Sequence, residues 1–296
     1  MLETPALLAH SADLELVIRH VLAGLGHGIH AGRERGAGVE FSEYRAYAPG
    51  DEWRRVDWKL LARADRYYVR EAERDSHVAS WLVLDATASM AEPSRRVDGL
   101  SKHWYARTAL ACVAAIAQRQ GDAFGLLVIS NGKVEFTQAS RGPRHLQRVL
   151  AALQRATPSG ELPDAETLRA SLHFARSQSM VFAASDALDW PSPLEEALVR
   201  LRHMRHDVRL LALRTEAEVE ANFAAGRAYR DPEEGARLHS FTRADRDQYH
   251  AALESHFAAV RSACRQHDVP LCEARIEQPL AEVLRAWLRK PEARRP

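Results

Sequence analysis

The chain has 296 residues, of which 46% are hydrophobic and 27% charged, the composition of a globular protein with one large domain or two modest ones. Its 41 basic residues are balanced by 40 acidic ones, which argues against a protein that binds nucleic acid through overall charge. No apolar run approaches the roughly 20 residues of a membrane-spanning helix, and the three cysteines form no CxxC pair. These features predict a reduced cytoplasmic protein without a membrane span.

The first quarter of the chain has a mixed character. Apolar residues recur at helical spacing over 13–25, behind the possible caps Ser11 and Asp13, and predict one helix. Glycines, arginines and aromatic residues then alternate, and predict two extended strands within 38–47 and 66–75. We expect residues 1–77 to form an appendage that packs on the main domain.

From residue 78 to 290, apolar strands alternate with amphipathic helices, the pattern of a mainly parallel sheet covered by helices. The Asn131-Gly132 pair between two strand patterns is typical of a hairpin and predicts one antiparallel edge strand. Residues 228–241 predict a further hairpin, and 291–296 a frayed tail. The predicted strands are 81–86, 123–130, 133–139, 180–185, 207–213 and 270–276, and the predicted helices are 99–119, 143–154, 167–177, 191–203, 245–266 and 280–289.

Two of these strands run directly into an aspartate. Asp85 follows the strand WLVL and is followed by Thr87 and Ser89, and Asp186 follows the strand MVFAAS. In open α/β sheets, ligands bind beyond the carboxyl ends of the strands, and Mg²⁺ prefers oxygen ligands. The pattern therefore predicts a site for Mg²⁺ or Mn²⁺. The alternative is that these residues only cap the next helix or form a turn.

Three tracts of the sequence resemble a known family. These are RGAGVEFSEYRAYAPGDEWRRVDWKLLARADRYYVREAE over 35–73, LDATASM over 84–90, and SDALD over 185–189. Together they are similar to the proteins that contain domain of unknown function 58, whose core resembles a von Willebrand factor A domain. The resemblance implies a Rossmann-like α/β fold of that type.

The resemblance also implies a metal-ion-dependent adhesion site. A threonine of a second loop should complete it, and the local sequence offers Thr157, Ser159 and Thr167. Thr167 is favoured because Leu168 and Leu172 would follow it on a helix face. The implied ligands are Asp85, Thr87, Ser89, Asp186 and Thr167, with Mg²⁺ or Mn²⁺ as the ion.

In such domains a carboxylate from a partner protein takes the last coordination position. The resemblance therefore implies a non-enzymatic, metal-dependent interaction module. Its partner would be an AAA+ ATPase of the MoxR type, with which it would help to assemble or activate a client protein.

Two other functions fit parts of the sequence. A haloacid dehalogenase-like, Mg²⁺-dependent phosphatase would use Asp85 as a nucleophile, but such enzymes usually place a second acid where this chain has Thr87. The arginines and aromatic residues of 33–74 suggest nucleic-acid binding, but ten basic residues there face nine acidic ones. That balance favours packing through ion pairs over nucleic-acid binding.

Overall fold

The computed structural model describes residues 14–29, 43–46, 68–71, 79–172, 178–221, 228–230, 238–240 and 243–289. The chain forms two compact units, one made of residues 1–27 with 78–296 and the other of residues 28–77. The sequence boundary expected after residue 77 grouped the first helix with the appendage, whereas the structure groups this helix with the large unit.

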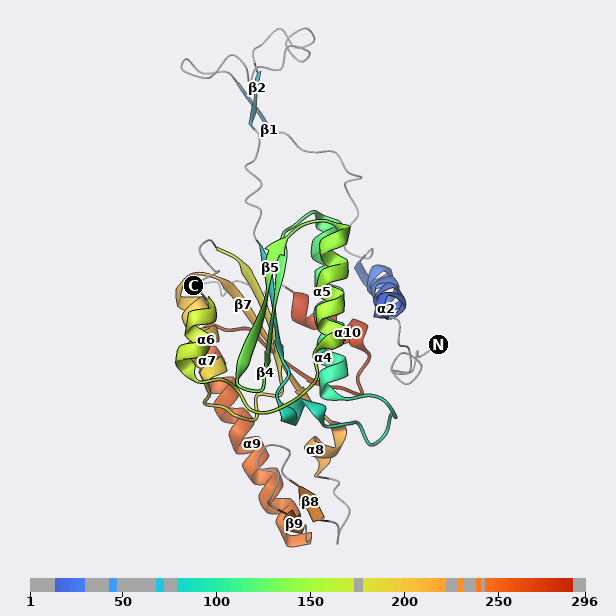
Figure 1. Cartoon of the computed structure of the whole chain (residues 1–296), viewed down its shortest axis with the longest axis vertical. Coiled ribbons are helices and arrows are strands. Elements are labelled where there is room, and N and C mark those ends of the chain that lie inside the picture. The colour runs from blue at the N-terminus through green and yellow to red at the C-terminus, as the bar shows by residue number, and fades with distance from the viewer. Residues whose placement is uncertain are drawn as a thin grey trace. The chain divides into compact units, whose positions relative to one another are not determined.

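A six-stranded sheet organises the large unit (Figure 1). Its strands follow the order β10-β7-β6-β3-β4-β5, and all neighbours pair in parallel except β4 and β5. This arrangement confirms the predicted α/β fold, with its one antiparallel edge strand. The strands are β3 (Ser80–Asp85), β4 (Phe124–Ser130), β5 (Lys133–Ser140), β6 (Met180–Ser185), β7 (Asp207–Arg214) and β10 (Leu271–Arg275).

Helices cover both faces of the sheet (Figure 1). Successive side chains of a strand point to opposite faces, so Leu82 and Leu84 of β3 enter one hydrophobic core and Trp81 and Val83 the other. The first face is covered by α2 (Leu14–Ile29), α4 (Lys102–Gln120), α5 (Pro143–Arg155) and α10 (Leu280–Leu288), and the second by α6 (Ala165–Ser171), α7 (Pro193–His203) and α9 (Arg243–Gln266).

Local sequence explains where these elements begin and end. The hydroxyl of Ser101 accepts the N–H of Trp104 and so caps α4, which ends at Gly121 in the left-handed conformation. Asn131 and Gly132 also have positive φ angles, the conformation that a tight two-residue hairpin between β4 and β5 requires.

Smaller elements complete the structure. A short 3₁₀ helix, η3 (Ala88–Ala91), follows β3, and α8 (Glu216–Glu220) follows β7. The predicted hairpin of 228–241 is present as antiparallel strands β8 (Ala228–Arg230) and β9 (Leu238–Ser240). In the unit of residues 28–77, β1 (Glu43–Ala46) pairs with β2 (Tyr68–Glu71), also antiparallel. The predicted tail at 291–296 lies outside the described residues.

The strand order contains one point where the winding direction of the sheet reverses. After β3 the chain continues to β4 and β5 on one side, then crosses to β6 and β7 on the other side of β3. The carboxyl ends of β3 and β6 therefore flank the position where the winding direction reverses, which is where open α/β sheets bind ligands. Across the described helices, none is long and apolar enough to cross a membrane.

Candidate functional site

The last residue of β3 and the loop that follows it carry polar side chains that contact one another. Asp85 is buried, and one of its carboxylate oxygens, Oδ1, accepts the backbone N–H of Thr87 at 3.0 Å and its hydroxyl at 2.7 Å. The Thr87 hydroxyl also lies 3.2 Å from the hydroxyl of Ser89. The three predicted first-loop oxygens are therefore brought together in the order Asp85, Thr87, Ser89.

The end of β6 contributes to the same cluster. The hydroxyl of Ser185 donates to the second oxygen of Asp85, Oδ2, at 2.6 Å, and its oxygen accepts the N–H of Ala187 at 3.0 Å. Asp186 is also buried, and its charge acts on Asp85. The two predicted strand-end carboxylates thus lie within electrostatic reach of each other, with Ser185 hydrogen-bonded to Asp85.

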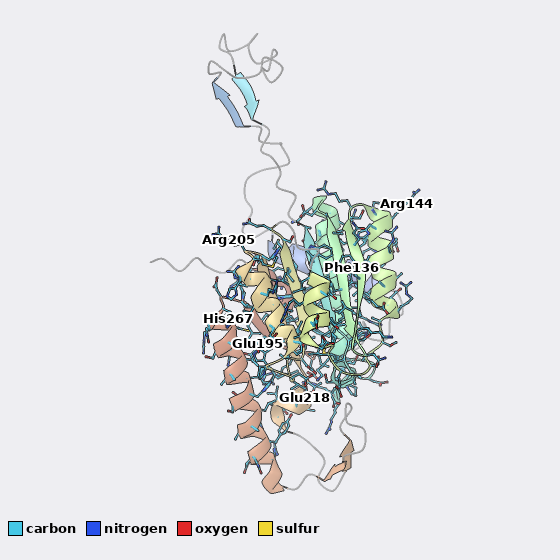
Figure 2. All side chains as sticks on the ribbon, turned by 60° about the vertical axis from the view of Figure 1, so that its left-hand side comes forward. Phe136, Arg144, Glu195, Arg205, Glu218 and His267 are labelled. Carbon is cyan, nitrogen blue, oxygen red and sulfur yellow. The ribbon has the colours of Figure 1, made fainter. Side chains whose placement is uncertain are left out.

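A buried lysine connects this cluster to the end of β7. The ammonium group of Lys102, in the first turn of α4, donates to Asp186 at 2.7 Å and to Glu218 at 3.0 Å. Glu218 also accepts the N–H and the hydroxyl of Thr215, which completes a reciprocal cap at the start of α8. Figure 2 shows Glu218 at the lower end of the sheet, the end to which β3, β6 and β7 lead.

Burial and charge perturb the groups of this network. Burial and, second, the charge of Asp186 raise the pKa of Asp85 to about 6, although hydrogen bonds from Ser185 and Thr87 act in the opposite direction. Burial would lower the pKa of Lys102, but Asp186 and Glu218 outweigh it and raise that pKa above its ordinary value. Lys102 is therefore an ammonium ion at neutral pH. The ionised form of Asp85 is disfavoured by burial and by the charge of Asp186.

The segment around Gly160 contacts the Asp85 loop through backbone hydrogen bonds. Ala88 donates its N–H to the carbonyl of Gly160 at 2.8 Å, and Ser159 donates its N–H to the carbonyl of Ala86 at 2.9 Å. Asn131, at the hairpin tip, donates to the carbonyl of Ser159 at 2.7 Å. The segment thus bridges the Asp85 loop and the hairpin between β4 and β5.

Thr167, the favoured second-loop ligand, lies in the first turn of α6. Its N–H donates to one oxygen of Asp164 at 2.8 Å and its hydroxyl to the other at 3.0 Å, so it takes part in the cap that begins α6. The backbone contacts to the Asp85 loop are made by Ser159 and Gly160 instead. Of the three hydroxyl residues that the sequence offered, Ser159 is therefore in the segment that borders the candidate site.

The oxygen atoms around Asp85 are suitable ligands for a small divalent cation. Octahedral Mg²⁺, with ligands at about 2.1 Å, places adjacent ligand oxygens about 3 Å apart. The Thr87 hydroxyl lies 2.7 Å from the Asp85 carboxylate and 3.2 Å from the Ser89 hydroxyl, close to that spacing. Asp186 differs, because the Lys102 ammonium already binds one of its oxygens. The described residues contain no group of three or more His, Cys, Asp or Glu side chains placed to hold a metal, so the hydroxyl groups are essential to any such site.

Sequence reasoning missed Lys102, Thr215 and Glu218. Thr215 and Glu218 have the Thr-x-x-Glu spacing of a capping box directly after a strand, a signal that the sequence does contain. Lys102 is preceded by the cap residue Ser101 and followed by a largely apolar helix, so a lysine there is unusual, but its partners are 84 and 116 residues away.

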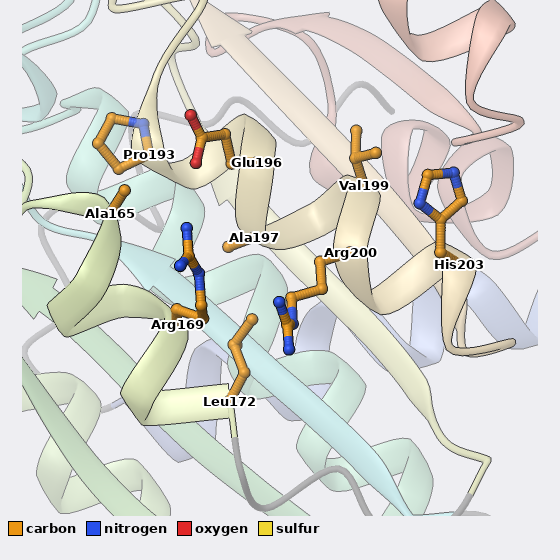
Figure 3. A pocket seen from close by; sticks show the side chains of 9 residues that line it. All are labelled: Ala165, Arg169, Leu172, Pro193, Glu196, Ala197, Val199, Arg200 and His203. Atoms are coloured by element: carbon orange, nitrogen blue, oxygen red, sulfur yellow. The ribbon is translucent and has the colours of Figure 1, made fainter.

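A pocket of about 350 Å³ lies elsewhere, between α6 and α7. Arg169 and Arg200 extend into the space between the two helices, with Glu196 and His203 at its sides (Figure 3). All four side chains are exposed, so solvent screens their charges. The pocket contains none of the strand-end residues and is separate from the candidate site.

Comparison with known proteins decides the family. Residues 43–259 match the family model described as "Protein of unknown function DUF58". The chain belongs to this family. It is 30% identical over 293 residues to the uncharacterized proteins Rv1480 of Mycobacterium tuberculosis and Mb1516 of Mycobacterium bovis, covering 96% of this chain and 90% of each relative.

The chain also matches solved structures, at low sequence identity and low TM-score. BatB from Bacteroides thetaiotaomicron has a TM-score of 0.43 at 13% identity, and the match covers 70% of this chain and 99% of BatB. The SpRpn10 VWA domain has a TM-score of 0.42 at 9% identity, with 70% and 93% of the two chains covered. The DUF58 chain described here has the mainly parallel α/β sheet with one antiparallel edge strand that its sequence predicted.

Proposed function

We propose that this DUF58 protein is a non-enzymatic binding module that holds a partner protein through a divalent cation, Mg²⁺ or Mn²⁺, at the Asp85 edge of the sheet. One observation carries the proposal. The oxygens of Asp85, Thr87 and Ser89 converge at the spacing of adjacent octahedral ligands, at the point where strand order reverses. Asp85, Thr87 and Ser89 would hold the ion.

The roles of the surrounding residues follow from their contacts. Ser185 fixes the second oxygen of Asp85, and the segment at Ser159 and Gly160 holds the loop by backbone hydrogen bonds. Asp186 supplies negative charge beside Asp85 without being a free carboxylate. A bound cation would be the largest local charge and would attract a carboxylate from outside the chain. That chemistry favours a partner that presents an aspartate or glutamate.

The resemblance of this chain to its family suggests the partner. We propose a MoxR-type AAA+ ATPase, together with which the module would assemble or activate a client protein. The phosphatase alternative has less support, because Thr87, where a second acid is needed, is an alcohol whose hydroxyl donates to Asp85.

A capture experiment tests this function. The purified full chain is immobilised and exposed to the MoxR-type ATPase of the same organism in Mg²⁺, in EDTA, and in Mg²⁺ with the Asp85→Ala variant. We expect capture by the wild type in Mg²⁺ and at least a tenfold loss in the other two conditions. Exposed Arg144 lies on α5, so Arg144→Met is the control that should capture normally. Equal capture in all conditions would contradict a metal-dependent contact.

A further inference from the structure

Lys102 is a buried positive charge where a helix does not favour one. It occupies the first turn of α4, close to the positive end of the helix dipole, and only 1% of its surface is exposed. A buried ion pair is often no more stabilising than apolar side chains of similar size, since both charges lose their hydration. Stability of the fold is therefore a weak explanation for this lysine.

Its position suggests a role in the charge balance of the candidate site. The buried ionisable groups of this network are three acids, Asp85, Asp186 and Glu218, and one base, Lys102. With all four ionised the network carries two net negative charges, and a divalent cation would neutralise it. Without Lys102, the three acids would carry three negative charges, and the same cation would leave one of them unbalanced. Glu92, which is also near Lys102 and Glu218, is half-buried, and solvent screens it.

We propose that Lys102 sets the cation affinity of the Asp85 site, holding Asp186 as its own counter-ion and keeping the site's affinity for a free divalent cation low. The inference rests on the function proposed above. Its chemical consequence is that the network loaded with a divalent ion is neutral, whereas without Lys102 it would keep one negative charge and repel a carboxylate from a partner. Lys102 is a positioning and charge-setting residue, because its contacts are with Asp186 and Glu218.

Two substitutions with opposite expected effects test the role of Lys102. Lys102→Met removes the charge and keeps an unbranched side chain, so Mn²⁺ should bind at least tenfold more tightly than to the wild type. Glu218→Gln removes one negative charge and leaves Lys102 in place, so Mn²⁺ should bind several-fold more weakly. General damage to the site would weaken binding in both variants, so a rise in one and a fall in the other is specific to charge.

The measurement is a Mn²⁺ titration of the full chain at fixed ionic strength, with free Mn²⁺ followed by electron paramagnetic resonance. Arg144→Met is the matched control, because it also removes one positive charge; it lies far from Glu218 (Figure 2) and should bind within twofold of the wild type. Thermal melting of each variant establishes that it is folded.

The outcomes separate this inference from the proposed function. If Lys102→Met binds Mn²⁺ as tightly as the wild type does, or more weakly, the proposed role of Lys102 is overturned. The proposed metal site is not affected by that result. A Lys102→Met chain that does not fold would leave Glu218→Gln to decide, and unchanged or tighter Mn²⁺ binding there would overturn the inference. Absence of Mn²⁺ binding to every variant at millimolar concentration overturns both the inference and the proposed function.

Discussion

At the scale of single residues, Asp85 is an acid whose ionised form is disfavoured by its surroundings. Both of its oxygens accept hydrogen bonds, yet burial and the neighbouring charge of Asp186 raise its pKa from 3.8 to about 6. An acid whose pKa is raised by folding holds its proton more tightly in the folded state. Its contribution to stability is therefore complete below about pH 4 and is lost as the pH rises through about 6.

This shift predicts a pH dependence that a variant can isolate. In EDTA, the free energy of unfolding of the wild type minus that of Asp85→Asn should fall by on the order of 2 kcal/mol between pH 4 and pH 7. Urea unfolding at several pH values measures both chains. His103, whose pKa burial and Arg107 lower to about 4, titrates equally in both and cancels. If the difference in the free energy of unfolding stays constant or rises with pH, the raised pKa of Asp85 is contradicted.

Gly160 differs from Asp85 because it contributes to the site through its backbone. Its φ is +59°, and a Cβ there would lie 2.7 Å from Cα of Asn131. Gly160→Ala should therefore lower the free energy of unfolding by more than 1 kcal/mol and weaken Mn²⁺ binding, because the carbonyl of Gly160 accepts the N–H of Ala88. Chemical unfolding and Mn²⁺ titration measure the two effects.

Gly142→Ala is the matched control for that substitution. Gly142 also has a positive φ, +90°, but a Cβ there would meet nothing within 4 Å. It carries the backbone strain without the collision, so it should cost less stability and leave Mn²⁺ binding unchanged. Equal losses in the two variants would show that Gly160 has no special role beside the Asp85 loop.

At the scale of elements, α8 is tied to the site through its cap. Thr215 and Glu218 cap each other at the start of this five-residue helix, and Glu218 binds Lys102. Thr215→Ala should lower the free energy of unfolding by about 1–2 kcal/mol and change Mn²⁺ affinity, since Glu218 loses the hydroxyl that holds it. Ser192→Ala removes the cap of α7 and should cost a similar amount without affecting Mn²⁺ binding. Identical Mn²⁺ affinities in both variants would mean that α8 is not coupled to the site.

Elements also show what the sequence can predict. Strand β6 was expected at 180–185 and lies there, because a short apolar run between polar turns has few alternatives. The hairpin at Asn131 and Gly132 was expected for the positive φ angles that these residues adopt. Helix α6 was expected at 167–177 but begins at Ala165, because Asp164 is its cap, and this cap also engages the Thr167 hydroxyl.

At the scale of the whole molecule, the site depends on which strands become neighbours. The sequence placed Asp85 and Asp186 each after a strand, and parallel pairing of β3 with β6 brings both ends to one edge of the sheet. The pairing of Lys102 with Asp186 and Glu218 had no local signal, since an ion pair between residues 84 or 116 positions apart follows only from the fold. The segment that borders the Asp85 loop, Ser159 and Gly160, is likewise selected by long-range backbone hydrogen bonds.

The central claim is that oxygens of the Asp85 loop hold one divalent cation. Crystals of the full chain soaked in Mn²⁺ and measured at a wavelength where manganese scatters anomalously test it most directly. The account predicts one anomalous peak within about 2–2.3 Å of oxygens of Asp85, Thr87 or Ser89, and its loss in Asp85→Ala crystals. A peak elsewhere, or none in wild-type crystals soaked at millimolar Mn²⁺, would contradict it.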